Sequence, residues 1–145
     1  MTEPTSGPNP VPDTEHEPAH DPEVLQLAAQ VFDLARDGDT AKLSAYIDAG
    51  VPANLTNDRG DSLVMLAAYH GHVDTVRALL QRGAEPDRTN DRGQTPLAGA
   101  VFKGEQEVID ALVGARVDPA AGAPSAIDTA RLFEKPELLK LFGAG

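Results

Sequence analysis

The chain has 145 residues, no cysteine, and a formal net charge of -11 from 12 basic and 23 acidic side chains. This length allows one modest domain, and the lack of cysteine excludes a disulfide framework, a thiolate zinc site and a cysteine nucleophile. The acidic balance opposes attachment to nucleic acid or to an anionic membrane surface, so neither is expected as a partner.

The first 22 residues differ in composition from the rest of the chain. They hold six of the 12 prolines and five acidic side chains, with no Lys or Arg. Such a segment buries too little apolar surface to offset its ordering entropy, which predicts a disordered acidic tail over 1–22 and a domain over 23–145. The stretch Pro8–Pro12 also fits polyproline II docking in an aromatic groove, but it lacks a basic flank, and a solvated tail is favoured.

Neither a secretory signal nor a membrane span is expected. The N-terminus has no basic segment followed by an apolar one, and no apolar run approaches the roughly 18 to 20 residues that cross a bilayer. A cytoplasmic location is therefore predicted.

A repeat of 33 residues organises the domain. Asn57-Asp58-Arg59-Gly60 recurs as Asn90–Gly93, and aligning residues 57–89 on 90–122 gives nine identities. Extended backwards, the same shift predicts a divergent first repeat, and forwards a shortened last repeat that closes the stack as a cap. The expected repeats are approximately 23–56, 57–89, 90–122 and 123–145.

The local chemistry agrees with helix pairs separated by turns. Asn-Asp-Arg-Gly is typical of a tight turn. Ser62 and Thr95 are expected to cap the following helices, Thr95 with proline at the first helical position. Left-handed helix ends are predicted at Gly38, Gly71 and Gly104. Apolar columns Leu43, Val76, Ile109, Leu139 and Tyr46, Leu79, Leu112, Phe142 are expected to form the core.

These motifs resemble the ankyrin repeat, most closely in Leu66–His72, Leu79–Ala84 and Thr95–Leu97. The resemblance implies an all-α solenoid of about four helix-turn-helix repeats with short β-hairpin tips, acting as a monomer. The chain departs from the family in two ways. Met65 and Ala98 stand where the family has a histidine that supports a hydrogen-bond network, and Arg116 occupies a glycine position where positive φ is expected.

Catalytic and metal sites are not expected. His70-Gly71-His72 suggests a metal pair, but His72 is the family's Gly-His residue and His70 lies at a variable surface position. Asp37–Thr40 lacks the further ligands of a calcium loop and is interpreted as a turn with a cap. No nucleophile elbow or phosphate loop is present, so the chain is predicted to be a non-enzyme without a cofactor.

The resemblance places partner binding on the hairpin tips and on the variable ends of the first helices. The corresponding residues are Asp58, Arg59, Asp61, Tyr69, His70, Asp91, Arg92, Gln94, Phe102 and Lys103, continued by Leu132 and Phe133. Aromatic and arginine side chains are typical of interface hot spots, although a solvated surface with partly buried aromatics fits each residue alone. The prediction is a module that binds an unknown protein, and the alternative is a regulatory or immunity-type subunit of a cognate enzyme.

Overall fold

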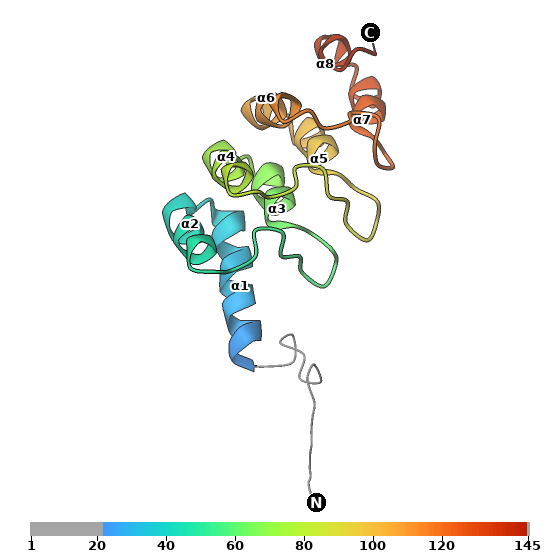
Figure 1. The fold of residues 1–145 in the computed structure, drawn as a ribbon. Coiled ribbons are helices and arrows are strands. Elements are labelled where there is room, and N and C mark those ends of the chain that lie inside the picture. The colour runs from blue at the N-terminus through green and yellow to red at the C-terminus, as the bar shows by residue number, and fades with distance from the viewer. Residues whose placement is uncertain (1–21, 145) are drawn as a thin grey trace, which may run out of the picture. The chain divides into compact units, whose positions relative to one another are not determined.

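A computed structural model describes residues 22–144 of the chain (Figure 1). The expected tail over 1–22 lies outside the described residues apart from Pro22. The chain divides into two compact units, residues 1–31 and 32–145, and the division falls within helix α1 (Pro22–Asp37). In the first unit the described part is the beginning of α1, up to Val31. The second unit holds the end of α1 and all the other helices.

The helices of the second unit lie in two rows. Helix α2 spans Thr40–Asp48, and the remaining helices are α3 (Leu63–Tyr69), α4 (Val73–Gln81), α5 (Pro96–Lys103), α6 (Gln106–Gly114), α7 (Ala126–Leu132) and α8 (Pro136–Leu141). The first row is α3, α5 and α7, in which neighbours contact each other, and the second contains α2, α4 and α6 (Figure 1). Because α3 also packs on α4, α5 on α6 and α7 on α8, the unit is a stack of helix pairs. The predicted all-α class is confirmed.

The loops between the pairs project from one side of this stack as the expected tips (Figure 1). They hold less β-structure than expected. Between residues 22 and 144 the β-pairing outside helices is limited to isolated bridges, which join Thr56 to Ser62 and Gly122 to Ser125. The tips are therefore tight turns rather than hairpins with strands.

Hydroxyl side chains begin the first helices as predicted. The Ser62 Oγ accepts the Met65 amide at 3.0 Å, and the Thr95 Oγ1 accepts the Ala98 amide at 3.1 Å. Helix α7 repeats the arrangement with Ser125, whose Oγ accepts an amide at 3.0 Å as part of a capping box. Each cap satisfies an amide that has no partner inside its helix and so marks where the helix starts.

Left-handed residues end the helices where the sequence predicted them. The φ angles of Gly38, Gly71 and Gly104 are 76°, 78° and 73°. A Cβ on Gly71 would also lie 2.6 Å from the Glu105 carboxylate, so a larger residue there would displace the end of that side chain. Arg116 has a φ of 66°, which confirms the expected strain at a position that other repeats give to glycine.

The apolar columns form the core in the middle of the stack. Leu43, Val76 and Ile109 are buried in one column, and Leu79 and Leu112 in the other. The column members Tyr46, Leu139 and Phe142 are only partly buried. Two polar contacts also join successive helix pairs: Thr40 Oγ1 lies 2.7 Å from Thr75 Oγ1, and His72 Nε2 lies 2.7 Å from the Arg36 carbonyl oxygen.

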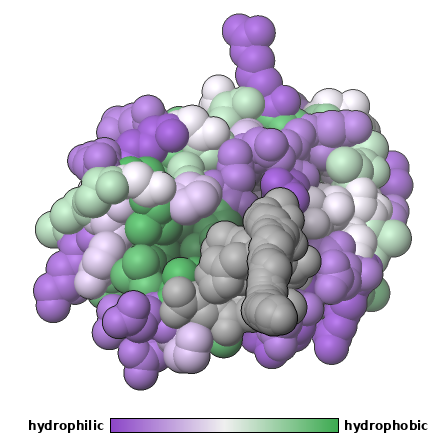
Figure 2. Space-filling model, turned by 60° about the horizontal axis from the view of Figure 1, so that its bottom comes forward, coloured by the Kyte–Doolittle hydropathy of each residue, from purple (hydrophilic) through white to green (hydrophobic). Residues whose placement is uncertain are grey.

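Figure 2 shows hydrophilic residues over much of one face, with a smaller hydrophobic area among them. Across residues 22–144, no helix has the length and apolar character needed to span a membrane.

Candidate partner-binding surface

The two Asn-Asp-Arg-Gly tips fold in the same way because an asparagine side chain organises each of them. The Asn57 Oδ1 accepts the amides of Arg59 and Asp61, both at 2.9 Å. The Asn90 Oδ1 accepts the two corresponding amides of the second tip, at 3.0 Å each. The glycine that ends each turn has positive φ, 77° in the first tip and 74° in the second. The predicted tight turns are therefore confirmed.

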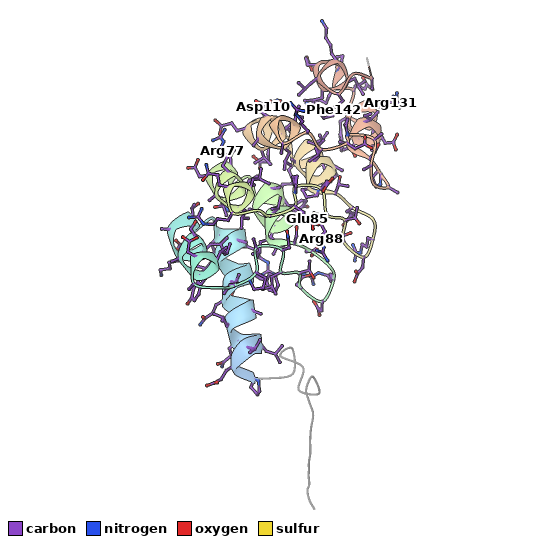
Figure 3. All side chains as sticks on the ribbon, viewed as in Figure 1. Arg77, Glu85, Arg88, Asp110, Arg131 and Phe142 are labelled. Carbon is purple, nitrogen blue, oxygen red and sulfur yellow. The ribbon has the colours of Figure 1, made fainter. Side chains whose placement is uncertain are left out.

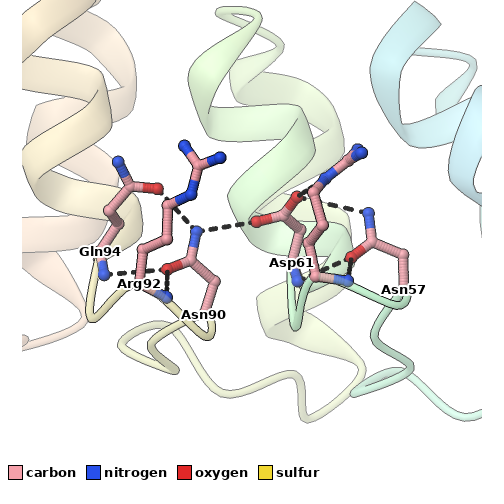
Figure 4. A network of polar contacts seen from close by, with 6 residues as sticks. Asn57, Asp61, Asn90, Arg92 and Gln94 are labelled. Carbon is pink, nitrogen blue, oxygen red and sulfur yellow. Dashed lines mark hydrogen bonds and ion pairs between the residues drawn. The ribbon is translucent and has the colours of Figure 1, made fainter.

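A polar ladder joins the first tip to the second (Figure 4). The Asn90 Nδ2 donates to Asp61 Oδ1 at 2.9 Å, and the Asn57 Nδ2 donates to Asp61 Oδ2 at 3.3 Å. The Arg59 Nε lies 3.4 Å from the same Oδ2. The main chain adds a bond from the Asp91 amide to the Arg59 carbonyl oxygen at 3.0 Å. Asp61 thus connects two successive repeats.

The ladder sets the charge state of Asp61, whose side chain is 14% exposed. Burial raises the pKa of Asp61, but hydrogen bonds from Asn90, Asn57 and Arg59 and the charge of Arg59 outweigh that effect. The pKa of the carboxyl group therefore lies below its ordinary value, and the group is ionised at neutral pH. Because both of its oxygens accept hydrogen bonds from other residues of the tips, Asp61 stabilises the fold and also lines the surface.

An aromatic groove of about 380 Å³ lies between the first helices and the next tip. Its lining residues are Met65, Tyr69, Gln94, Thr95, Ala98, Gly99, Phe102, Pro124 and Thr129. Tyr69 ends α3 and is 38% exposed, and Phe102 stands at the equivalent place in α5 and is 57% exposed. We refer to this cavity as the aromatic groove.

The floor of the aromatic groove is apolar where the family has histidine. Met65 and Ala98 occupy the histidine positions, and both are buried and line the groove. Gly99 also lines the groove next to the Tyr69 ring, since a Cβ built on it would lie 3.5 Å from that ring, an ordinary van der Waals contact. The departure noted in the sequence therefore produces a hydrophobic pocket.

Basic and aromatic side chains surround Tyr69 and Phe102. The Lys103 Nζ lies 4.8 Å from the centre of the Tyr69 ring, a cation–π distance. The His70 ring meets Tyr69 edge-on at 5.5 Å. Phe133 packs edge-on against Phe102 at 5.6 Å, so it continues the row as expected. Leu132 is 75% exposed.

His70 and His72 have different environments. Partial burial lowers the pKa of His70, and the nearby charges of His72, Lys103 and Arg36 lower it further, while Asp37 opposes them. The His72 ring is turned to the Arg36 carbonyl oxygen at 2.7 Å, which gives it a structural role. In the described part of the chain, no group of three or more His, Asp or Glu side chains is placed to hold a metal ion.

The expected binding residues fall into two adjoining grooves. Tyr69 and Phe102 line the aromatic groove, with His70 and Lys103 at its side. A second cavity of about 400 Å³, the tip groove, is lined by Asp58, Arg59, Asp61, Asn90, Asp91, Arg92 and Gln94. Gln94 lines both grooves. The sequence analysis did not name Asn90, Met65 and Ala98 as residues that line a groove, although their positions in the repeat were recognisable.

Comparison with known proteins identifies the repeats. A family model described as ankyrin repeats, in three copies, matches residues 25–121. A curated relative from Pseudomonas aeruginosa, named as an ankyrin repeat protein, is 52% identical over 60 residues. That alignment covers 41% of this chain and 35% of the relative, so the chain matches about a third of that protein's length.

Proposed function

The chain belongs to the ankyrin repeat family, and on that premise we propose that it binds a partner protein through the aromatic groove and the adjoining tip groove. Ankyrin repeats generally mediate protein–protein interactions, and the family is typically non-enzymatic. The proposed activity is occupancy of a surface, without chemistry on the partner.

The aromatic groove is the observation that supports this proposal most directly. Phe102 and Tyr69 are large apolar side chains that remain exposed at equivalent positions of two repeats. Aromatic residues in a partly enclosed cavity are typical of the anchors that dominate protein interfaces. The cavity of about 380 Å³ is large enough for side chains of a partner and is bordered by polar groups of the tip groove.

The test is direct binding of a captured partner to matched variants. We expect Tyr69→Ala and Phe102→Ala each to weaken binding by roughly 1 to 3 kcal/mol, mainly through faster dissociation. Surface plasmon resonance measures both rates. Leu141→Ala is the matched control, since Leu141 is an exposed apolar residue of α8, 44% exposed, outside both grooves.

Charged residues of the second helices provide a further control. Arg77 on α4 and Asp110 on α6 are exposed and distant in the stack from the tips (Figure 3). Substituting them with alanine should leave partner affinity unchanged. If Arg77→Ala and Asp110→Ala abolish binding while Tyr69→Ala and Phe102→Ala do not, and all four variants melt like the wild type, the site is on the second helices.

The alternative function, a regulatory or immunity-type subunit, uses the same surface and stays a prediction. The identity of the captured partner distinguishes the two functions. The regulatory subunit is favoured if the partner is an enzyme and its activity changes when the chain is added. The Tyr69→Ala variant should then change that activity less than the wild type does.

A further inference from the structure

The two tips differ in charge at one position. Asp61 of the first tip corresponds to Gln94 of the second, while Arg59 corresponds to Arg92. Both Asp61 and Gln94 accept a hydrogen bond from the asparagine of their own tip, from Asn57 at 3.3 Å and from Asn90 at 2.8 Å. The second tip therefore keeps the fold of the first but has a neutral amide where the first has the Asp61 carboxylate.

This exchange leaves Arg92 without the ion pair that its counterpart has. Arg59 pairs with Asp61 at 3.4 Å. Five other arginines also have a carboxylate within 4.0 Å: Arg36, Arg77, Arg82, Arg88 and Arg131. For the remaining two arginines, Arg92 and Arg116, no such ion pair is present within residues 22–144, and of these Arg92 lines the tip groove.

The other carboxylates of the tip groove do not replace the missing one. Asp61 is engaged with Asn57, Arg59 and Asn90. The Asp91 carboxylate is turned toward the first tip, where one of its oxygens lies 2.6 Å from the point that a Cβ on Gly60 would occupy. Asp58 is exposed and belongs to the first tip. The guanidinium of Arg92 thus has no carboxylate partner among the described residues that line the tip groove.

The position of Gln94 connects this charge to the aromatic groove. Gln94 lines both grooves, and its side chain and that of Arg92 extend from the second tip in the same direction (Figure 4). Resting on the proposed function, we propose that the surface recognises a protein segment in which an acidic residue neighbours a bulky apolar one. The apolar side chain enters the aromatic groove, and the carboxylate pairs with Arg92.

Charge complementarity supports this occupant despite the acidic character of the whole chain. A guanidinium binds a carboxylate through two parallel hydrogen bonds, and the neighbouring amide of Gln94 is a further donor. Lys103, whose Nζ lies 4.8 Å from the centre of the Tyr69 ring, adds a second positive charge next to a residue of the groove. A basic segment would instead leave Arg92 and Lys103 facing like charges.

The experiment is selection of random twelve-residue peptides, displayed on phage, against the full chain. The Tyr69→Ala/Phe102→Ala protein is added in solution as a competitor. Peptides that stay on the wild-type chain in its presence are the ones that use the groove. We expect Asp or Glu to be enriched next to Leu, Phe or Trp in these peptides. A synthetic peptide of the enriched sequence and its Asp→Asn version are then titrated by fluorescence polarisation.

Two variants remove the free charge in different ways. Arg92→Gln deletes it, and Gln94→Asp supplies an internal carboxylate as Asp61 does for Arg59. Each should weaken the acidic peptide about tenfold, as loss of one charge-assisted pair predicts, and should leave the Asp→Asn peptide unchanged. Arg77→Gln is the matched control: Arg77 is an exposed arginine of α4 that pairs with Asp74 and lies outside both grooves, so it should change neither peptide by more than about twofold.

The outcomes distinguish this inference from the proposed function. The inference is overturned if the peptides that depend on Tyr69 and Phe102 show no acidic enrichment, or if their acidic preference survives Arg92→Gln. In either case the groove remains a binding site. If no enriched peptide is sensitive to Tyr69→Ala/Phe102→Ala, the proposed function of the groove fails as well.

Discussion

Asp61 shows how one side chain contributes both to a turn and to the contact between turns. Its two oxygens accept from Asn57 in its own tip and from Asn90 in the next. A neutral amide has the size of a carboxylate but presents one acceptor and two donors, so it would place an N–H against one of these donors. Accepting from both asparagines therefore requires the two acceptor oxygens of a carboxylate at residue 61.

Asp61→Asn is expected to destabilise the fold by roughly 1 to 3 kcal/mol at neutral pH, the usual worth of hydrogen bonds to a charged group. Because the pKa of Asp61 is below its ordinary value in the folded chain, the stabilisation is present above that ordinary value, about 4, and is lost as the pH falls through the folded value. The melting temperatures of wild type and variant should therefore converge in acid. A difference that stays constant from pH 7 to pH 3 would contradict the ladder.

Arg116 is the second residue whose local geometry can be tested alone. Its φ of 66° corresponds to the glycine positions Gly50 and Gly83, whose φ angles are 122° and 89°. Arg116→Gly should stabilise the chain by up to about 1 kcal/mol, because relief of the left-handed strain exceeds the entropy that glycine adds to the unfolded chain. Arg116→Ala is the control: it removes the charge and keeps the Cβ, so it should give no such gain in thermal or urea unfolding.

Small side chains in the first helices let successive repeats approach each other. Ala67, Ala68 and Ala100 are fully buried, and α3 packs against both α4 and α5. Close packing leaves no space for a longer side chain at these positions. The spacing of the repeats thus depends on residues that the family resemblance already indicated.

Ala68→Arg tests this packing. A charged side chain forced into the buried face of α3 should cost several kcal/mol, on the order of 3 or more, which is a large part of the stability of a small domain. Circular dichroism and thermal melting measure the loss. Ala45→Arg is the matched control, since Ala45 is exposed on α2 and should tolerate arginine. Equal melting of both variants would mean that the buried face of α3 is misassigned.

On the scale of the second unit, stability is expected to vary from pair to pair. Repeat proteins gain stability from contacts with neighbouring repeats. Helix α8 has six residues and one buried residue, Leu138, whereas α5 has five buried residues and α6 has three. Helices α4 and α5 contact neighbours on both sides in their rows, so these two helices and their pair partners α3 and α6 should be protected best.

Hydrogen exchange with mass spectrometry should therefore show slow exchange in α3 to α6 and faster exchange in α8. The difference in exchange rate between α8 and the other helices should disappear only when the whole unit unfolds, for instance near the midpoint of urea unfolding. Protection of α8 equal to that of α5 would show a fully cooperative unit instead.

The boundary near residue 22 also stays a prediction. We expect a chain that lacks residues 1–21 to melt within error of the full chain, because their composition offers no apolar pattern for a core. Differential scanning calorimetry of the two chains decides this. A clear decrease in melting temperature would show that these residues contribute to the folded state.

The sequence alone determined much of the fold, because the features that specify it are local. The 33-residue period, the caps at Ser62 and Thr95, and the left-handed positions at Gly71 and Arg116 each depend on a few neighbouring residues and elementary sterics. It also located the aromatic residues Tyr69 and Phe102, since equivalent positions of a repeat must lie on one face of the stack.

Only the tertiary structure decided how these residues combine. The bond from Asn90 to Asp61 joins side chains 29 residues apart, and the shared position of Gln94 between two grooves depends on the packing of α3, α5 and the tips. The exchange of Asp61 for Gln94 is visible in the sequence, but its effect on Arg92 is not. Whether a charge is paired depends on distances of a few ångströms across repeats, which are set by the packing of whole helices and not by the residues of one turn.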